Sequence, residues 1–557
     1  MANVSGTYRC QGSSYRWRRA NLAILACATA LSMTGAAYGQ LALNPFAKSE
    51  KLRDQKLELS MKIKQPFTVV AVGDMLQMTP FSKIQDPDIQ SLVKIMQDAD
   101  LTLANNENIV VDHTTFRGPI AHLEAPTTVA DDWANMGIDI VNKANNHTWD
   151  AGEDGLWQDF HQLDRVGIAH VGADYDLTEA RMARGVTTSK GTAALVGTYA
   201  DNDLGELTGL PVGHATVYVT VDQLKQLREM RDSIVARRKE VANPILPPGP
   251  DPDGEAVVFG LDFKIGSKPV ATEDQPSKLQ KMLQESLSRQ GKISSKISTL
   301  ALTTYNGVTI AQMAQLRAIA GDNGSGNTLA AFGVHFKVMP GPGEYSYDML
   351  PQQERDILRE VRSGKQIYDF EAATAHWHQN RYAYQQYSFD HYPADFEIKF
   401  AHDAIDQGAD LFFGHGVHTI KGIEIYKGKP IFYGLSNFVL QEQEFHSWRD
   451  RGAQKPTPLE GPIVGDAEQD EEEWGWMEKP GNLETLLTSS HYENGKLVEV
   501  RIYPVDLGDG SRPGSQLGTP KRARLEVANR ILREVEEYSK PFGTKIVIEN
   551  GIGVIRP

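Results

Sequence analysis

The sequence predicts an α/β protein whose sheet is covered by helices on both faces, and two observations support this. Apolar runs of strand length alternate along the chain with amphipathic helical segments, a pattern typical of α/β folds. The 557 residues are 40% apolar and 23% charged, a composition typical of a folded protein with a large core. Because the chain exceeds the usual size of one domain, we expect one large domain carrying long insertions.

The alternation begins after a polar connector. We expect strands at 67–74, 101–108, 138–144, 168–173 and 192–200, with helices at 88–100, 128–136 and 152–167 between them. From 201 to 366 the pattern weakens, turn-rich stretches appear, and two long polar helices are expected near 221–241 and 276–290. The strand pattern resumes at 368–377, 409–418 and 429–439, with a helix at 395–408. Asn494-Gly495 predicts a hairpin turn, and a helix at 521–538 with a short strand closes the chain.

The first 39 residues have the pattern of an export signal. Arg18 and Arg19 precede an apolar stretch, and small residues at 37–39 suit a cleavage site. The alternative is an uncleaved N-terminal membrane anchor, and the general and twin-arginine export routes both stay open. We therefore expect a periplasmic or cell-surface protein.

Removal of this segment changes the chemistry available to the mature chain. Both cysteines, Cys10 and Cys27, lie inside it, so the mature part has no disulfide, no thiolate metal site and no cysteine nucleophile. Cys27 also offers a lipoprotein cleavage box, to which Leu25 is a poor fit. Loss of the segment's four arginines changes the net charge from −15 to −19. An acidic chain argues against general nucleic-acid binding.

The pattern divides the chain into segments with different expected roles. We expect a signal peptide at 1–39, a linker at 40–64, a core domain at 65–200 and 367–510, an inserted subdomain at 201–366, a surface loop at 441–481, and a C-terminal helix and strand at 511–557.

Polar side chains follow the ends of successive predicted core strands. They are Asp74, Glu107, Asn146 with His147, His376, and His415 with His418. Ligand-binding groups in α/β sheets lie beyond the carboxyl ends of the strands, so we expect these residues to converge. Oxygen and imidazole donors without sulfur suit zinc, manganese or iron, and two such ions clamp a phosphoryl group or activate water. Taken singly, an isolated histidine is more often a satisfied structural residue than a ligand, and an aspartate after glycine is usually a turn residue or a helix cap.

The sequence at these positions resembles a known family. "VVAVGDMLQM", "ADLTLANNEN", "GIDIVNKANNHTWDAG", "ATAHWHQN" and "GADLFFGHGVHTIKGIEIYKGKPIFYGLSNFV" look like the CapA motifs, in the same order. CapA proteins are bacterial capsule-synthesis proteins linked to poly-γ-glutamate, with the fold of calcineurin-like metallophosphoesterases. The resemblance covers roughly 66–200 and 368–508. It implies a two-sheet core with outer helices, an α-β-β-α sandwich, and a site for two divalent ions.

The resemblance also implies roles for individual residues. Asp74 matches a metal ligand, and Glu107 occupies the slot of a bridging carboxylate. Asn146 would bind the second ion, and His147 would face the substrate as a proton donor or charge stabiliser. Asp150 would hold the His147 ring in one tautomer. The remaining ligands implied are His376, His415 and His418.

Several positions depart from the family pattern. Leu76 stands where classical phosphoesterases have a histidine, which implies that one ion is weakly held. The usual "GHHPH" is "GHGVH", with Gly416 and Val417, and Asn106 replaces a common leucine. We expect a more polar and less crowded pocket.

Two functions remain open at this point. The first is an exported, divalent-metal-dependent hydrolase or phosphoesterase of capsule or poly-γ-glutamate metabolism, acting on an anionic polymer or a small phosphoester or amide. The second is a noncatalytic component for assembly or export of such a polymer, associated with membrane-bound synthesis machinery.

Overall fold

The computed structural model describes residues 55–118, 123–202, 217–241, 251, 253–259, 261–266, 295–341, 343–382, 390–441, 483–508 and 517–557. The core lies within the compact unit Glu58–Pro557. The expected export signal, the helix expected at 276–290 and nearly all of the loop expected at 441–481 lie outside the described residues. Among the described helices, none is long and apolar enough to cross a membrane.

The first of two large sheets is mixed and has ten strands. Strands β1, β2, β5 and β6 run parallel, and β21 joins β1 antiparallel. The main path is β24 (Val547–Glu549), β25 (Ile552–Ile555), β22 (Lys496–Asp506), β21 (Glu484–Glu493), β1 (Phe67–Leu76), β2 (Leu101–Asn106), β5 (Ile140–Asn142) and β6 (Ala169–Val171), with β20 (Asn437–Leu440) beside β1 and β23 (Lys521–Arg522) beside β22.

The second sheet also has ten strands, and its central strands are parallel. Its main path is β13 (Thr328–Ala331), β14 (Val334–Val338), β12 (Thr299–Val308), β8 (Gly191–Asn202), β16 (Phe370–His376), β17 (Leu411–His415), β19 (Lys429–Phe432) and β18 (Ile423–Tyr426), with β7 (Arg184–Thr188) beside β8 and β15 (Tyr345–Met349) beside β12. Two smaller sheets pair β3 (Ile109–Val111) with β4 (Glu124–Pro126), and β9 (Val217–Val219) with β11 (Leu261–Ile265) and β10 (Glu255–Val258).

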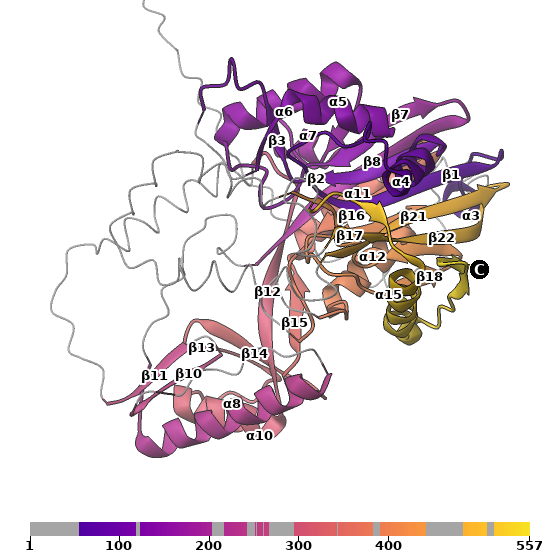
Figure 1. Cartoon of the computed structure of the whole chain (residues 1–557). Coiled ribbons are helices and arrows are strands. Elements are labelled where there is room, and N and C mark those ends of the chain that lie inside the picture. The colour runs from indigo at the N-terminus through magenta and orange to yellow at the C-terminus, as the bar shows by residue number, and fades with distance from the viewer. Residues whose placement is uncertain are drawn as a thin grey trace, which may run out of the picture. The chain divides into compact units, whose positions relative to one another are not determined.

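Alternate residues of the central strands face two different cores. On β1, Val69 and Ala71 pack in the core shared by the two sheets, while Val70 and Val72 pack under the outer helices. The helices on this outer face are α4 (Pro87–Gln97), α5 (Thr127–Met136) and α6 (Gly152–Val166) (Figure 1). The outer face of the second sheet is covered by α11 (Pro351–Ile367) and α12 (Asp395–Gln407). The expected α-β-β-α sandwich is confirmed.

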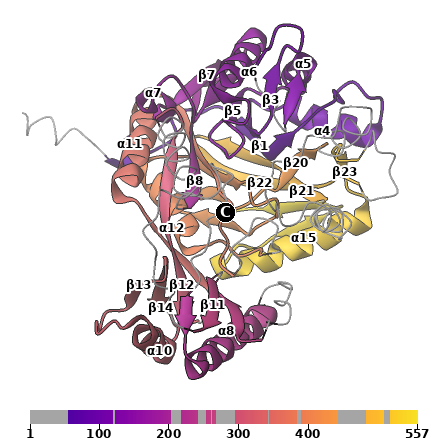
Figure 2. The same ribbon diagram turned by 90° about the vertical axis from the view of Figure 1, so that its left-hand side faces the viewer.

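The region expected to be an inserted subdomain, 201–366, is partly built into the core. The first half of β12, Thr299–Leu302, pairs with β8, and its second half, Tyr305–Val308, pairs with β14. A separate apolar cluster lies between α8 (Val221–Val241), α10 (Ile310–Ala320) and the strands β10, β11 and β14. Both views show these elements together at the far end of β12 (Figures 1 and 2). Strands β12, β13, β14 and β15 of this range therefore belong to the second sheet, and α11 covers its outer face.

The hairpin turn and the C-terminal helix predicted from the sequence are both confirmed. Asn494 and Gly495 have φ of 54° and 74°, the left-handed conformation that a tight turn requires, and they join β21 to β22. The C-terminal helix is α15 (Leu525–Ser539), followed by the 3-10 turn η2 (Lys540–Phe542) and the hairpin of β24 and β25. At the other end, α3 (Gln55–Glu58) precedes Met61 and Ile63, whose side chains are buried in the core between the sheets, so the expected linker ends in packed structure. Short α7 (Leu177–Arg181) leads into β7.

The two sheets approach each other closely at Gly197 of β8. A Cβ at this position would lie 2.0 Å from Oδ1 of the buried Asn142 on β5. We expect Gly197→Ala to lower the free energy of unfolding by about 1 to 3 kcal/mol, because the sheets must move apart to admit the methyl group. The control is Gly326→Ala, where the nearest atoms lie 4.0 Å away and the residue is exposed. Equal midpoints for both variants in chemical denaturation would contradict this close approach.

Candidate metal centre

Strand ends from both sheets bring five of the predicted ligands together. Asp74 lies near the end of β1, and Glu107 follows β2 by one residue. His376 and His415 are the last residues of β16 and β17 and are partners in the parallel ladder, and His418 follows in the next loop. Because these strands end at the same place, side chains far apart in sequence lie within contact distance.

Strand β1 is irregular where it reaches Asp74. Its pairing with β2 shifts register between Ala71 and Asp74, and the Asp74 N–H donates to the Ser436 carbonyl at 3.1 Å. Gly73 permits this approach, since a Cβ there would lie 1.8 Å from the same carbonyl oxygen. Such an irregularity redirects a side chain at the end of a strand, and here it affects the Asp74 carboxylate.

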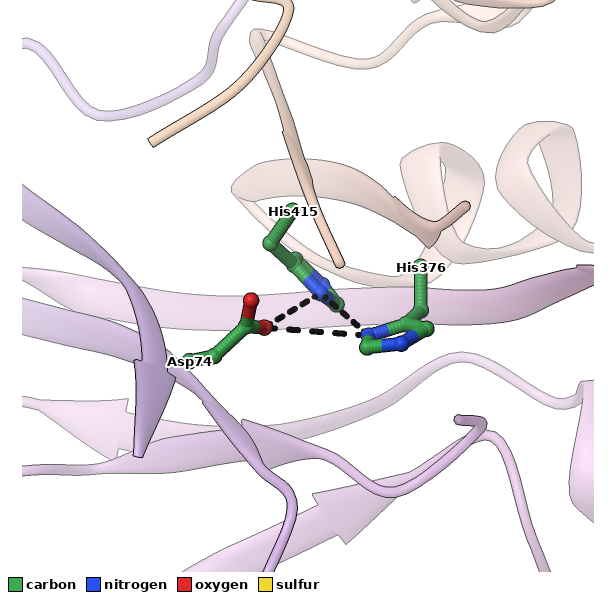
Figure 3. Close-up of side chains that lie close together, drawn as sticks. All are labelled: Asp74, His376 and His415. Carbon is green, nitrogen blue, oxygen red and sulfur yellow. Dashed lines mark hydrogen bonds and ion pairs between the residues drawn. The ribbon is translucent and has the colours of Figure 1, made fainter. Parts of the chain in front are cut away.

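The first group of ligand atoms comprises Asp74, His376 and His415, all fully buried (Figure 3). Oδ1 of Asp74 lies 3.1 Å from Nδ1 of His415 and 3.7 Å from Nδ1 of His376. The two Nδ1 atoms are 3.0 Å apart. One carboxylate oxygen and two imidazole nitrogens thus face a common point, as ligands of one ion do.

The second group comprises Asp74, Glu107 and His418, whose ligand atoms all lie within 4.8 Å of one another. Oδ2 of Asp74 is 3.9 Å from Nδ1 of His418. That nitrogen lies 2.5 Å from Oδ1 of Asn437, a hydrogen bond that favours the tautomer whose lone pair is on Nε2. Asp74 is the residue common to both groups, and the bridging role that the resemblance implies for Glu107 stays a prediction.

The protonation states of these residues suit a metal ion. Burial raises the pKa of the Asp74 carboxyl, but hydrogen bonds and charge from His376 and His415 outweigh this effect and hold the pKa well below its usual value. Burial lowers the pKa of His376 well below its ordinary value, against the hydrogen bond and charge of Asp74. To bind a metal ion, Asp74 must be an ionised carboxylate and the histidines must be neutral imidazoles. The pKa shifts of Asp74 and His376 favour these forms. Nε2 of His415 is also buried without a hydrogen-bond partner among the described residues.

The loop that carries Asn146, His147 and Asp150 connects to the centre through its neighbour Asn145. Asn145 Nδ2 donates to Oδ1 of Asn105 at 3.3 Å, and Asn105 Nδ2 donates to Oδ1 of Asp74 at 2.8 Å. Nδ1 of His147 lies 2.7 Å from Oδ2 of Asp150, the pairing expected from the sequence. Oδ1 of Asn146 is buried and has no hydrogen-bond partner among the described residues. Its role as a ligand, and that of His147 as an acid, stay predictions.

The family model described as "Bacterial capsule synthesis protein PGA_cap" matches residues 68–244 and 282–442, more than half of the chain. The chain belongs to this family. The two matched segments include Asp74, Glu107, His376, His415 and His418, and the resemblance to CapA proteins is thereby confirmed.

Relatives of the chain extend this assignment. Two uncharacterized proteins of Sinorhizobium fredii are each 28% identical over 88% of this chain and 93% of their own length. The PGA biosynthesis protein CapA of Bacillus subtilis is 31% identical over 17% of this chain and 23% of its own. A "probable polyglutamine synthesis accessory protein" of Mycobacterium tuberculosis is 36% identical over 15% and 20%. A "putative 5'-nucleotidase" structure from Staphylococcus aureus aligns with a TM-score of 0.28 and 8% identity over 67% of this chain and 49% of its own, too weak a likeness to support any inference.

In this PGA_cap protein, a buried polar network lies behind Glu107. Asn106 Nδ2 donates to Oδ2 of Asp159 on α6 at 2.9 Å, and Nζ of Lys143 lies 3.1 Å from the same oxygen. Lys143 also donates to the Asn108 carbonyl. Asn106, Asp159 and Lys143 are fully buried. The network holds the chain on both sides of Glu107 and joins it to the strand that leads into Asn146.

Sequence reasoning missed the residues that orient the ligands. Asn105 and the backbone N–H of Gly416 donate to the two oxygens of Asp74, at 2.8 Å and 2.9 Å. Asn437 contacts His418, and Asn142 Nδ2 donates to Oδ1 of Asn105 at 2.9 Å. Asparagines in the last residues of two strands were a signal for Asn105 and Asn142, since such side chains are rare inside strands without a specific partner. Gly416 stood out in the sequence only as a departure from the family pattern, and the contact of Asn437 with His418 depends on tertiary packing.

Removing Asp159 is expected to leave the buried Lys143 ammonium without its carboxylate. We expect Asp159→Ala to lower the free energy of unfolding by about 3 to 5 kcal/mol, measured by denaturant titration. The matched control is Asp164→Ala on the same helix, where the side chain is 70% exposed and a change within about 0.5 kcal/mol is expected. If both variants lose the same amount, the Lys143 network does not stabilise the fold.

Substitutions at Asp74 and at His147 are expected to have different effects on the metal content of the protein. Asp74→Asn preserves shape but removes the negative charge shared by both ligand groups, so it should lose most of the bound manganese or zinc. His147→Ala should retain it, because His147 is assigned no ligand role. Elemental analysis of both variants after gel filtration tests this difference. Equal loss of metal from the two variants would contradict the assignment of Asp74 as a ligand and His147 as a residue that does not bind the ion.

Proposed function

We propose that this protein is an exported, divalent-metal-dependent hydrolase of the phosphoesterase type that serves capsule or poly-γ-glutamate-type polymer metabolism. The observation that carries the proposal is the meeting of Asp74, Glu107, His376, His415 and His418 in two ligand groups that share one carboxylate. The chemistry that such ions supply when bound is Lewis-acid polarisation of a phosphoryl or carbonyl oxygen and activation of water.

The difference in exposure between the ligands and the histidine dyad supports a catalytic role. The side chains of Asp74 and His376 are fully buried, whereas those of His147 and Asp150 are 23% and 28% exposed. A group that transfers a proton to substrate must be reachable, while ligands are held best away from water. Asp150 accepts from Nδ1 of His147 and holds the ring so that Nε2 points away from this bond. His147 would then donate a proton to the leaving group or stabilise its charge.

The substrate class follows from the site and the family together. Relatives are named for PGA biosynthesis and capsule biosynthesis, so we propose an ester or amide bond in an anionic surface polymer or a small phosphoester as the target. With a net charge of −19 after loss of the N-terminal segment, broad electrostatic capture of a polyanion is unfavourable. Bound divalent cations would supply the local positive charge that recognition needs.

A noncatalytic role is the second candidate, and the names of the relatives favour it. Several are described as biosynthesis or accessory proteins rather than hydrolases. In that case the ions would be structural, and the protein would act beside membrane-bound synthesis machinery. The arginine-led apolar segment at 1–39 supports export in either case, to the periplasm or the cell surface.

Hydrolysis assays on manganese- or zinc-loaded protein separate the two candidates. We expect wild type to hydrolyse aryl phosphodiesters or to shorten poly-γ-glutamate, and His147→Ala to be slower by about 100- to 10,000-fold, as for loss of a general acid. The control His161→Ala removes an exposed histidine of α6 and should retain full activity. Unchanged activity in His147→Ala would exclude it as the acid. A metal-loaded wild type that hydrolyses neither substrate would favour the noncatalytic role.

A further inference from the structure

A pocket lies on helix α6, which begins two residues after Asp150. Its volume is about 360 Å³, at the small end of the range for pockets that bind small molecules. One wall is a face of α6, and the other is the loop after β3, a strand that packs against this helix (Figure 1). The lining includes Phe116 and Arg117 of the loop and Asp154, Trp157, Gln158 and His161 of the helix. None of these residues belongs to either ligand group of the metal centre.

The pocket adjoins the loop that carries the proposed acid. Its helical positions 154, 157, 158 and 161 recur at the spacing of one helix face, over about 10 Å of the helix axis. At the end of α6 nearest to Asp150, Phe116 packs against the apolar cluster that contains Ala151. A polymer chain bound along this face would therefore lead toward the pair formed by His147 and Asp150.

Trp157 is held in place by its neighbours. Its ring stacks on that of Tyr175 with centroids 4.1 Å apart, and it meets the ring of Phe160 edge-on at 5.6 Å. Its Nε1–H donates to Oε1 of Glu153 at 3.4 Å, and Nζ of Lys296 lies 3.1 Å from the same oxygen. An aromatic side chain that is already ordered loses little conformational freedom when a ligand packs against it.

The polar side chains of the pocket can bind a ligand that both donates and accepts hydrogen bonds. Those of Asp154 and Gln158 form no hydrogen bond with another described residue. The Arg117 guanidinium donates to the carbonyls of Phe116 and Thr114, at 2.7 Å and 2.8 Å, and has further N–H groups. A carboxylate only accepts, a guanidinium only donates, and an amide does both, so together they match a set of hydroxyl groups.

The charges at the pocket do not suit a polyanion. Arg117 and Asp154 carry opposite charges within the lining, and Lys296 beside it is paired with Glu153. Capture of a polyanion requires a local excess of positive charge, and a glutamate unit would bring its carboxylate close to that of Asp154. A neutral sugar instead combines hydroxyl groups with an apolar C–H face that packs on an aromatic ring.

We propose that this pocket binds a neutral sugar unit of the polymer that is processed at the metal centre. Trp157 packs against the C–H face of the sugar, and Asp154, Gln158 and Arg117 form hydrogen bonds with its hydroxyl groups. That the sugar belongs to the substrate rests on the proposed function, whereas sugar binding itself requires neither a metal ion nor hydrolysis. The aryl phosphodiesters and poly-γ-glutamate of the hydrolysis assays contain no sugar, so substitutions in the pocket leave those assays unchanged.

Sugar binding to the full mature chain tests the proposal. We expect cellobiose, maltose or N,N′-diacetylchitobiose to bind with a Kd of about 1 mM, with or without Mn²⁺, in saturation-transfer NMR and calorimetry. Trp157→Ala should weaken this binding about 10-fold or more. Asp154→Ala and Gln158→Ala should each weaken it about 2- to 10-fold, as for loss of one hydrogen bond. The control Asp164→Ala, on the same helix but outside the lining, should bind as wild type does.

The two polar variants keep the test valid if Trp157→Ala fails to fold, because Asp154 and Gln158 have no printed role in packing the core. Binding of none of the three disaccharides to wild type would overturn the proposal, and so would binding that all three pocket variants retain. Binding of γ-glutamyl-glutamate or adenosine in place of the sugars, lost in the same variants, would assign the pocket to another ligand and overturn it as well. Sugar binding by a chain that binds no metal would instead contradict the proposed function alone.

Discussion

The buried carboxylate of Asp74 is the constraint on which the centre depends. An ionised carboxylate without water is unfavourable by several kcal/mol unless donors and cations compensate it. Here Asn105 and the Gly416 N–H each donate to one of its oxygens, and two imidazoles lie within 4 Å. The irregularity of β1 and the close passage of Ser436 aim the carboxylate at this point. A divalent cation, when bound, would supply the remaining compensation, so the same geometry that is costly without an ion favours binding one.

Two buried ion pairs support the centre, one from each sheet. On the first sheet, Lys143 and Asp159 hold the chain around Glu107. On the second sheet, Lys421 lies 2.8 Å from Glu397 of α12 and donates to the Gln379 carbonyl at 3.2 Å. Lys421 thereby joins the loop after His418 to the segment after His376. Buried ion pairs add little net stability, but each has few alternative positions, so they fix the loops that carry the ligands.

The sequence predicted the parts of this structure that depend on local pattern. Apolar runs ending in polar residues located Asp74, His376 and His415 correctly at strand ends, because a parallel strand buried on both faces has a recognisable pattern. The pattern did not show that β20 lies beside β1, which brings Asn437 to His418, because strand order is set by tertiary packing. It also separated 201–366 from the core, whereas β12 pairs with β8. Apolar and polar residues alternate only weakly along β12 because its first half lies in the sandwich and its second half lies beside the outer cluster.

The region between the two core segments of the sequence contacts the segment that follows the candidate ligand His376. Strand β15 forms hydrogen bonds with the segment that follows His376. The Tyr345 N–H donates to the Arg381 carbonyl at 2.7 Å, and the Tyr347 hydroxyl donates to the Asn380 carbonyl at 2.9 Å. Because β15 also pairs with β12, which continues into the outer cluster, the position of the segment is linked to that cluster through the backbone ladder. The outer cluster is therefore connected through β12 and β15 to the segment that follows His376.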